Sequence, residues 1–184
     1  AEKSEGVFMA YVSEVEQTEA APELREIYAT IEKGFGTVPH FFKALGALPE
    51  VITAQLRMSS AIMGDGALPA SLKEQIGLVV SGINSSSYCI AIHMELLQQF
   101  GFEKQFARKL ATDYPHAPAD EKTKALFRFA DKLTRKPVDV EQSDADEVLR
   151  VGWSQDALRE TVLTVAFFNY INRVSFGLGL VADF

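Results

Sequence analysis

Three residues in the middle of the chain, Cys89, His93 and Glu74, have side chains that could work together in catalysis. A thiol becomes a strong nucleophile only when it ionises, and a nearby imidazole can take its proton directly or through a water molecule. A carboxylate can orient that imidazole and stabilise its charged form. If the fold brings the three side chains together, they predict thiol chemistry.

The spacing of these residues predicts that they meet. Residues 82–85 are expected to form the turn between two helices, and Glu74 and His93 lie equally far from its centre in sequence. If the helices run antiparallel, both residues lie at the same height, roughly 12 Å from the turn at about 1.5 Å per residue. Cys89 precedes His93 by one helical turn, so the two share a helix face. Cys89 is also in the first turn of its helix, where the macrodipole favours a thiolate.

The same residues have a purely structural interpretation. Cys89 and His93 begin a stripe at helical spacing that is typical of a core-facing side and continues with Leu96, Leu97 and Phe100. Free cysteine is also among the residue types most often buried. Taken by themselves, these residues favour an inert, buried Cys89 modestly over a catalytic one.

The elements that must position these residues are predicted to be helices. Gly and Pro divide the chain into helical patterns, and the alternation typical of strands is scarce. We expect helices at 21–34, after Pro39, at 49–64, 69–82 and 86–101, and near 103–111, 119–135, 141–151 and 155–181, with a loop at 113–118. The prediction is an all-α, single-domain chain over 1–184, with a central antiparallel helix hairpin carrying the site. Residues 1–8 are expected to be disordered, or a non-native segment before a start at Met9.

Composition limits the classes of partner. Hydrophobic residues make up 47% of the 184 residues and charged residues 23%, which excludes a disordered chain. Lys and Arg total 18 against 25 Asp and Glu, a net charge of −7 without a basic cluster. We therefore expect neither nucleic acid nor a membrane as partner. Because there is one cysteine and no recognisable signal peptide, we expect a cytoplasmic location.

Several helical patterns, notably 155–181, are apolar on more than one face, which predicts a homo-oligomer. Asn169, Asn172 and Arg173 interrupt this pattern and are expected to form a polar seam between helices or subunits rather than line a pocket. His40 is expected at a helix start or on the surface.

His116, between two prolines, is expected in solvent. A chain with three His and one Cys is poor in the ligands that a structural zinc site needs, and no Gly-rich phosphate motif occurs. The sequence therefore predicts neither a metal nor a cofactor.

The three candidate residues lie in a longer pattern. Eleven residues follow Glu74, and then comes the stretch Ser86-Ser87-Tyr88-Cys89-Ile90-Ala91-Ile92-His93. This resembles the active-site signature of the alkylhydroperoxidase D-like (AhpD-like) superfamily, which includes carboxymuconolactone decarboxylases: Glu, eleven residues, Cys, two residues, Cys, three residues, His. The stretches VPHFFKALGALPEVI, LPASLKEQIGLVVSGINSSSYC and FFNYINRVSFGLGL resemble the branch of uncharacterised peroxidase-related proteins, so the resemblance covers most of the chain.

The resemblance implies an all-helical AhpD-like fold, assembly into trimers or hexamers, and peroxide reduction at a cysteine pair. It implies that Cys89 attacks the peroxide, that His93 generates the thiolate of Cys89, and that Glu74 takes part in the same proton relay. Ser86 stands where the family has its resolving cysteine, and it is either native or an engineered replacement. Because a hydroxyl cannot form a disulfide, Cys89 would need an external thiol to return from the sulfenic acid.

Two neighbours of the cysteine are auxiliary candidates. Ser86 is expected to act as a helix N-cap rather than in chemistry. Tyr88 either places its hydroxyl near the thiolate or packs as an ordinary core aromatic. Phe41 and Phe42 are candidates for apolar walls that would suit an organic substrate.

The leading prediction is a one-cysteine thiol peroxidase acting on hydrogen peroxide or an organic hydroperoxide. One alternative is a carboxymuconolactone-decarboxylase-like lyase, in which His93 and Glu74 would perform acid–base chemistry on a small carboxylic acid. Another is a non-catalytic helical oligomer with a degenerate site that binds a small molecule or a partner. A reactive, accessible thiol favours catalysis, and a buried, unreactive one favours the last interpretation.

Overall fold

The computed structural model describes residues 10–182, and within this range the chain folds into α-helices and short 3-10 turns without a strand. The all-α prediction is therefore confirmed. The predicted segment 1–8 and Met9 lie outside the described residues. The helices are α1 (Pro22–Phe35), α2 (His40–Ala44), α3 (Pro49–Met63), α4 (Ala70–Ile83), α5 (Ser87–Gln99), α6 (Lys104–Asp113), α7 (Glu121–Arg135), α8 (Gln142–Arg150) and α9 (Gln155–Gly177), with 3-10 turns at Tyr114–His116 and Pro137–Asp139.

Proline and small polar residues determine where most helices begin. Pro22 and Pro49 occupy the first position of α1 and α3, where a missing N–H costs no helical hydrogen bond. Helix α4 begins one residue later than predicted, so Pro69 is its N-cap residue rather than its first helical residue. The side chains of Asp120 and Ser154 cap α7 and α9 by accepting hydrogen bonds from backbone N–H groups of the first turn.

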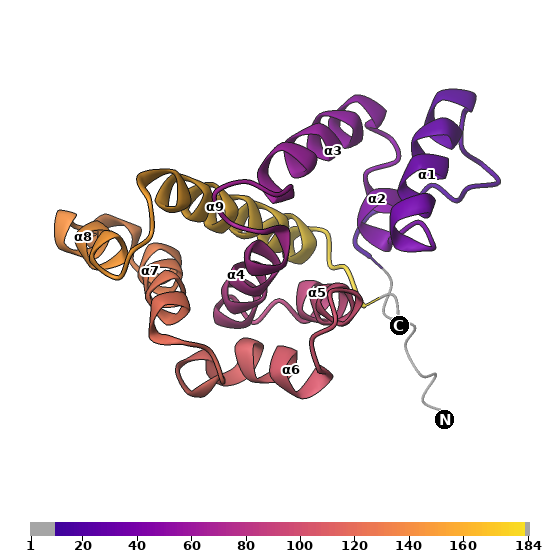
Figure 1. The fold of residues 1–184 in the computed structure, drawn as a ribbon. Coiled ribbons are helices and arrows are strands. Elements are labelled where there is room, and N and C mark those ends of the chain that lie inside the picture. Colours follow the sequence, from indigo (N-terminus) through magenta and orange to yellow (C-terminus); the bar gives the residue numbers. More distant parts are fainter. Residues whose placement is uncertain (1–9, 183–184) are drawn as a thin grey trace.

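Helix α4 is the centre of the fold. Every residue from Leu72 to Ser81 is buried, and α4 contacts α5, α6, α7 and α9, which surround it in Figure 1. Two glycines permit this close packing. A Cβ atom at Gly77 would lie 2.0 Å from the ring of Phe168 on α9, and one at Gly82 would lie 2.0 Å from the carbonyl oxygen of Ala111 on α6.

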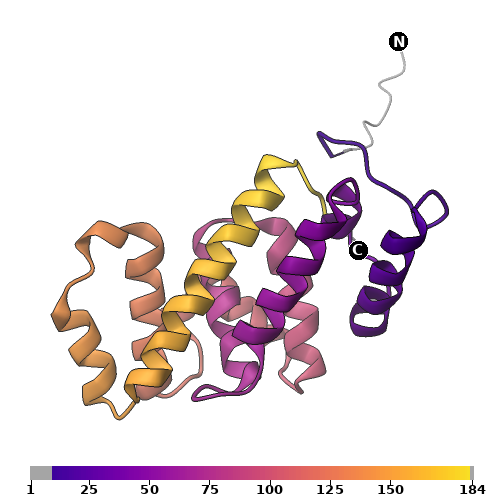
Figure 2. The same ribbon diagram turned by 90° about the horizontal axis from the view of Figure 1, so that it is seen from above.

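The apolar side chains form two clusters on either side of α5. The larger cluster joins α4 to α6, α7, α8 and α9, and the smaller one joins α1 and α2 to residues of α3 and α5. Figures 1 and 2 show α1 and α2 at one end of the molecule, and α7 and α8 at the other. No helix among the described residues has the length and apolar character needed to cross a membrane.

Tyr28 anchors α1 beside α2. Its side chain is fully buried, and its hydroxyl donates a hydrogen bond to the carbonyl oxygen of Val15 at 2.9 Å. Burial and the carboxylates of Glu16 and Glu14 raise the pKa of Tyr28 to about 12, so the phenol stays protonated at neutral pH. The hydroxyl also lies 3.4 Å from the carbonyl oxygen of Phe42, which helps to hold α2 in place.

The predicted polar seam lies between helices α4 and α9. The amide nitrogen of Asn84 donates to the side-chain oxygens of Asn172 and Asn169 at 2.8 and 3.0 Å. Asn172 in turn donates to the hydroxyl of Ser81 at 3.1 Å, and Arg173 donates to Asn169 at 2.7 Å. These side chains therefore join α4 to α9 rather than line a pocket.

A partly buried ion pair ties the connection between α3 and α4 to α9. The ammonium group of Lys73 lies 3.0 Å from the carboxylate of Glu160 and donates to the carbonyl oxygen of Gly64 at 2.6 Å. The same carboxylate accepts hydrogen bonds from the N–H groups of Ala67 and Leu68, each at 2.9 Å. Burial alone raises the pKa of Glu160, but the two N–H donors and the ammonium group outweigh it and hold this pKa below its usual range.

We expect Glu160→Gln to lower the free energy of unfolding by about 3 kcal/mol at neutral pH, because Lys73 keeps a buried charge without a carboxylate partner. The folded-state pKa of Glu160 is depressed, so its contribution is complete above the unfolded-state pKa and disappears as pH falls through the folded-state value. Urea unfolding at about pH 7 and about pH 3 should therefore show a difference between wild type and variant that shrinks in acid.

The exposed carboxylate of Glu50 provides the matched control, Glu50→Gln, which should change stability little. A difference between wild type and Glu160→Gln that is equally large at both pH values would contradict the assignment.

Candidate functional site

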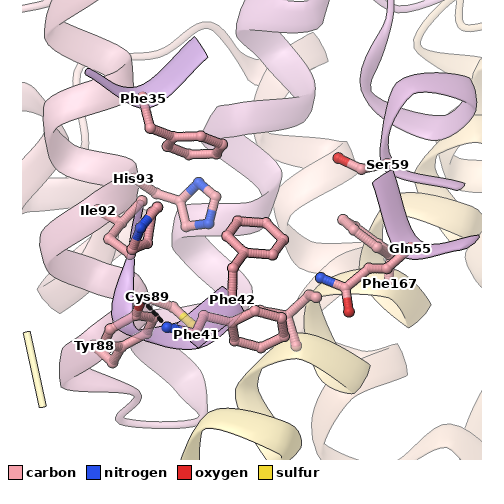
Figure 3. Close-up of a pocket in the computed structure, with 12 residues that line it drawn as sticks. Phe35, Phe41, Phe42, Gln55, Ser59, Tyr88, Cys89, Ile92, His93 and Phe167 are labelled. Carbon is pink, nitrogen blue, oxygen red and sulfur yellow. Dashed lines mark hydrogen bonds between the residues drawn. The ribbon is translucent and has the colours of Figure 1, made fainter. Parts of the chain in front are cut away.

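The candidate site is a partly open cavity of about 90 Å³ between α2, α3, α5 and α9 and the end of α1 (Figure 3). A cavity holds a water molecule from about 10–15 Å³ upwards, so this one has room for a small ligand. Its walls are mostly aromatic or aliphatic, and they include the predicted Phe41 and Phe42. The lining residues are Phe35, Pro39, Phe41, Phe42, Gln55, Ser59, Tyr88, Cys89, Ile92, His93, Phe167 and Ile171.

Helices α4 and α5 bring Glu74 and His93 into direct contact, as their spacing in sequence led us to expect. Nδ1 of His93 lies 2.6 Å from Oε2 of Glu74, and the two side chains are 16% and 12% exposed. A carboxylate accepts the hydrogen bond, so the neutral imidazole carries its proton on Nδ1. Nε2 is then unprotonated, makes no hydrogen bond within residues 10–182, and can accept a proton from a group in the cavity.

An aromatic ring holds the imidazole from a second side. The rings of His93 and Phe168 have centroids 4.6 Å apart and are inclined at 59°. Phe168 fills the space that the missing side chain of Gly77 leaves, so the glycine on α4 helps to position the imidazole on α5. Reasoning from sequence missed Phe168, although an isolated glycine inside an apolar helix is a recognised sign of close packing.

Cys89 is the third residue of α5 and thus lies in the predicted first turn. The residue is only 1% exposed, yet it lines the cavity together with His93 (Figure 3). Its sulfur lies 3.7 Å from Oγ of Ser175 on α9. No hydrogen bond joins Cys89 to His93 within the described residues, so a proton would pass between them through a molecule in the cavity.

The structure confirms the prediction for Ser86 only in part. It is the N-cap residue of α5, but its side chain makes no capping hydrogen bond, so the predicted capping role of the hydroxyl is wrong. The reason is the backbone conformation: ψ is 88° at Ser86, against 162° and 165° at the side-chain caps Asp120 and Ser154. The hydroxyl of Ser86 is buried and has no hydrogen-bond partner among the described residues.

Tyr88 connects the cysteine helix to α2. Its side chain lines the cavity, and its hydroxyl accepts a hydrogen bond from the backbone N–H of Phe41 at 3.0 Å, drawn as a dashed line in Figure 3. This contact holds the start of α2, with Phe41 and Phe42, against α5. Tyr88 therefore positions a wall of the cavity.

The other two histidines lie outside the cavity. His40 begins α2, where its Nδ1 lies 2.6 Å from a carboxylate oxygen of Glu14. His116 is exposed, and its Nδ1 lies 2.8 Å from Asp113. In the part of the chain that the structure describes, no three His, Cys, Asp or Glu side chains form a group that could hold a metal ion.

Residues 49–136 match the sequence profile of the carboxymuconolactone decarboxylase family. This segment runs from the start of α3 to the residue after α7 and contains Glu74, Cys89 and His93. No curated protein sequence matches the chain significantly.

Several solved structures resemble the chain over almost its whole length. One is an uncharacterized peroxidase-related protein with an alkylhydroperoxidase AhpD core from Ralstonia eutropha JMP134, at 22% identity and a TM-score of 0.88, covering 95% of this chain and 92% of that one. Another is an uncharacterized peroxidase-related protein from Silicibacter sp. TM1040, at 25% identity and a TM-score of 0.87, covering 97% and 96%.

A cysteine-to-alanine variant of the debrominase Bmp8, in complex with 2,3,4-tribromopyrrole, is also similar, at 19% identity and a TM-score of 0.81, covering 94% and 91%. The predicted AhpD-like fold is thereby confirmed.

The hydrogen bond between His93 and Glu74 predicts the tautomer of the imidazole. We expect neutral His93 to be protonated on Nδ1 in the wild-type protein, and both tautomers to be populated in Glu74→Ala. Long-range proton–nitrogen NMR correlations of the ring distinguish the two forms. Glu95→Ala removes an exposed carboxylate from the same helix and should leave the tautomer unchanged. A wild-type ring protonated mainly on Nε2 would contradict this geometry.

Proposed function

The chain belongs to the superfamily of AhpD-like proteins and carboxymuconolactone decarboxylases, and on this premise we propose that it is a one-cysteine thiol peroxidase. The observation that carries the proposal is the cavity itself. It is lined by a thiol and by an imidazole whose other nitrogen is held by a carboxylate. These are the three groups needed to form a thiolate and use it as a nucleophile.

In the proposed reaction, Nε2 of His93 takes the proton of Cys89 through a water molecule or the bound peroxide. Glu74 keeps the imidazole oriented and stabilises it when it is charged. The thiolate attacks one peroxide oxygen, the O–O bond breaks, and the proton held by His93 goes to the departing alkoxide. The sulfur is oxidised by two electrons to a sulfenic acid, and the hydroperoxide is reduced to an alcohol, or to water from hydrogen peroxide.

The return step needs thiols from outside the chain, because Cys89 is the single cysteine. A first thiol attacks the sulfenic sulfur, which releases water and forms a mixed disulfide. A second thiol displaces Cys89 from it and leaves as a disulfide with the first. The complete cycle thus converts one hydroperoxide and two thiols into an alcohol, water and a disulfide.

The character of the cavity supports an uncharged organic hydroperoxide as substrate. Aromatic side chains from α1, α2 and α9 face the space beside the sulfur, among them Phe35, Phe41, Phe42 and Phe167. None of the described lining residues is Lys or Arg. A small carboxylic acid would therefore find no Lys or Arg to neutralise it, which weakens the alternative of a carboxymuconolactone-decarboxylase-like lyase.

The oligomeric state and location also remain proposals. Leu163, Tyr170 and Phe176 on α9 are exposed in the single chain, which supports a homo-oligomer, expected to be a trimer or hexamer. We further propose that the protein acts in the cytoplasm, where external thiols are abundant.

The central prediction concerns the cysteine and its base. We expect reduced wild-type protein to lose one thiol on reaction with cumene hydroperoxide, and Cys89→Ala to lose all turnover. His93→Gln should react about 10²–10⁴-fold more slowly, because the proton acceptor is missing. Stopped-flow kinetics with thiol titration measures both effects, and His116→Gln, which replaces an exposed histidine outside the cavity, is the matched control.

Peroxide turnover that survives Cys89→Ala would refute the peroxidase. Turnover of a carboxylic acid that survives thiol alkylation would instead support the lyase. A thiol that stays unreactive towards peroxide at every accessible pH would support the non-catalytic interpretation.

Ser86 generates a separate prediction. We expect oxidised wild-type protein to be trapped by dimedone as a sulfenic acid. In Ser86→Cys, the sulfenic acid should instead be lost to an intramolecular disulfide, because residues 86 and 89 are one helical turn apart. Intact-protein mass spectrometry separates the two products. If the variant remained fully dimedone-reactive after oxidation, Ser86 would not occupy a resolving position.

A further inference from the structure

We propose that Ser175, on α9, is the hydrogen-bond donor that stabilises the Cys89 thiolate, a role that rests on the proposed thiol chemistry at this site. The two side chains meet across α5 and α9, with 3.7 Å between Sγ and Oγ. Both residues are buried, at 1% and 2% exposure. Among the described residues, this is the hydrogen-bonding contact that the structure gives the sulfur.

The hydroxyl of Ser175 can serve both protonation states of the sulfur. The O–H group donates a hydrogen bond to the carbonyl oxygen of Ile171, one turn earlier on α9, with 2.9 Å between the two oxygens. While Cys89 is a thiol, its S–H can donate to the lone pairs of the serine oxygen. Once Cys89 has lost its proton, the serine hydroxyl can rotate and donate to the sulfur instead. The carbonyl oxygen of Ile171 then still accepts the helical hydrogen bond from the backbone N–H one turn later in α9.

The surroundings make this donor important. A thiolate at this position faces mainly apolar side chains of α2 and α9, including Phe41, Phe42 and Ile171. The titratable groups that line the same cavity are His93 and Tyr88, both on α5, and the hydroxyl of Tyr88 accepts a hydrogen bond from the backbone N–H of Phe41. Gln55 and Ser59, from α3, are neutral. A buried charge beside so many apolar side chains is costly, so the hydroxyl that lies within reach of the sulfur has a large effect.

Ser175 therefore acts on the reacting atom itself, whereas His93 and Glu74 act on the proton. The start of α5 adds the favourable end of a helix dipole, because Cys89 is in its first turn. The hydroxyl of Ser175 comes from α9, whereas the imidazole of His93 and the helix dipole come from α5, so substitution of Ser175 isolates its own contribution.

The test is a titration of the thiolate by its ultraviolet absorbance. Subtracting the titration of Cys89→Ala removes the contribution of the five tyrosines, and the remaining signal reports on Cys89, the single cysteine of the sequence. We expect Ser175→Ala to move the midpoint upwards by about one pH unit, the size expected when a charged group loses one hydrogen bond. Ser175→Thr keeps the hydroxyl and should keep the midpoint near the wild-type value.

Thr164→Val is the matched control. Thr164 also lies on α9, is fully buried, and its hydroxyl has no hydrogen-bond partner among the described residues. We expect this variant to titrate like the wild type. Reaction with cumene hydroperoxide at pH 7 should slow by up to about tenfold in Ser175→Ala, and the difference should disappear above the shifted midpoint.

An unchanged midpoint in Ser175→Ala, or an equal shift in Thr164→Val, would overturn the inference. Because the titration needs no substrate, it also separates this inference from the proposed function. A shifted midpoint in a protein without peroxide activity would support the role of Ser175 and refute the peroxidase.

Discussion

The arrangement of the site depends on a carboxylate inside a buried helix. Glu74 lies on α4, whose residues from Leu72 to Ser81 are all shielded from solvent. A carboxylate in such surroundings is costly unless another group binds it, and the imidazole of His93 does so at 2.6 Å. That contact restricts how α5 can lie against α4. Since Cys89 is one turn from His93, the same contact determines where the sulfur lies.

The elements that enclose the sulfur come from distant parts of the sequence. The hydroxyl of Tyr88 accepts a hydrogen bond from the backbone N–H of Phe41, and the ring of Phe168 packs against Gly77, which has no side chain. The asparagine network joins α9 to α4. The result is a cavity with aromatic walls and few polar groups. Electrostatic interactions are stronger in such surroundings than in water, so each of the few donors and acceptors present counts for more. The chemistry of the site is therefore sensitive to single hydroxyl and imidazole groups.

Local patterns predicted much of this arrangement. Proline and glycine positions indicated the helices to within a few residues, and the symmetric spacing of Glu74 and His93 about one turn predicted their contact. The contributions of α9 could not be predicted in this way. Ile171 and Ser175 lie about 80 residues from the cysteine, and nothing local specifies which face of an apolar helix meets it. The uncapped hydroxyl of Ser86 was missed because capping depends on a backbone angle, which the residue type alone does not determine.

The space between positions 77 and 168 has room for the ring of Phe168 or for a side chain at position 77, but not for both. The aromatic ring comes within 2.0 Å of the place that a Cβ atom at position 77 would occupy, and interiors packed this densely do not absorb such an overlap. Gly77 could therefore be replaced by a residue with a side chain only together with a smaller residue at position 168. Because that ring also rests on His93, such a pair of changes would alter the surroundings of the imidazole. Substitutions at the two positions are thus coupled, although the positions lie on helices far apart in the chain.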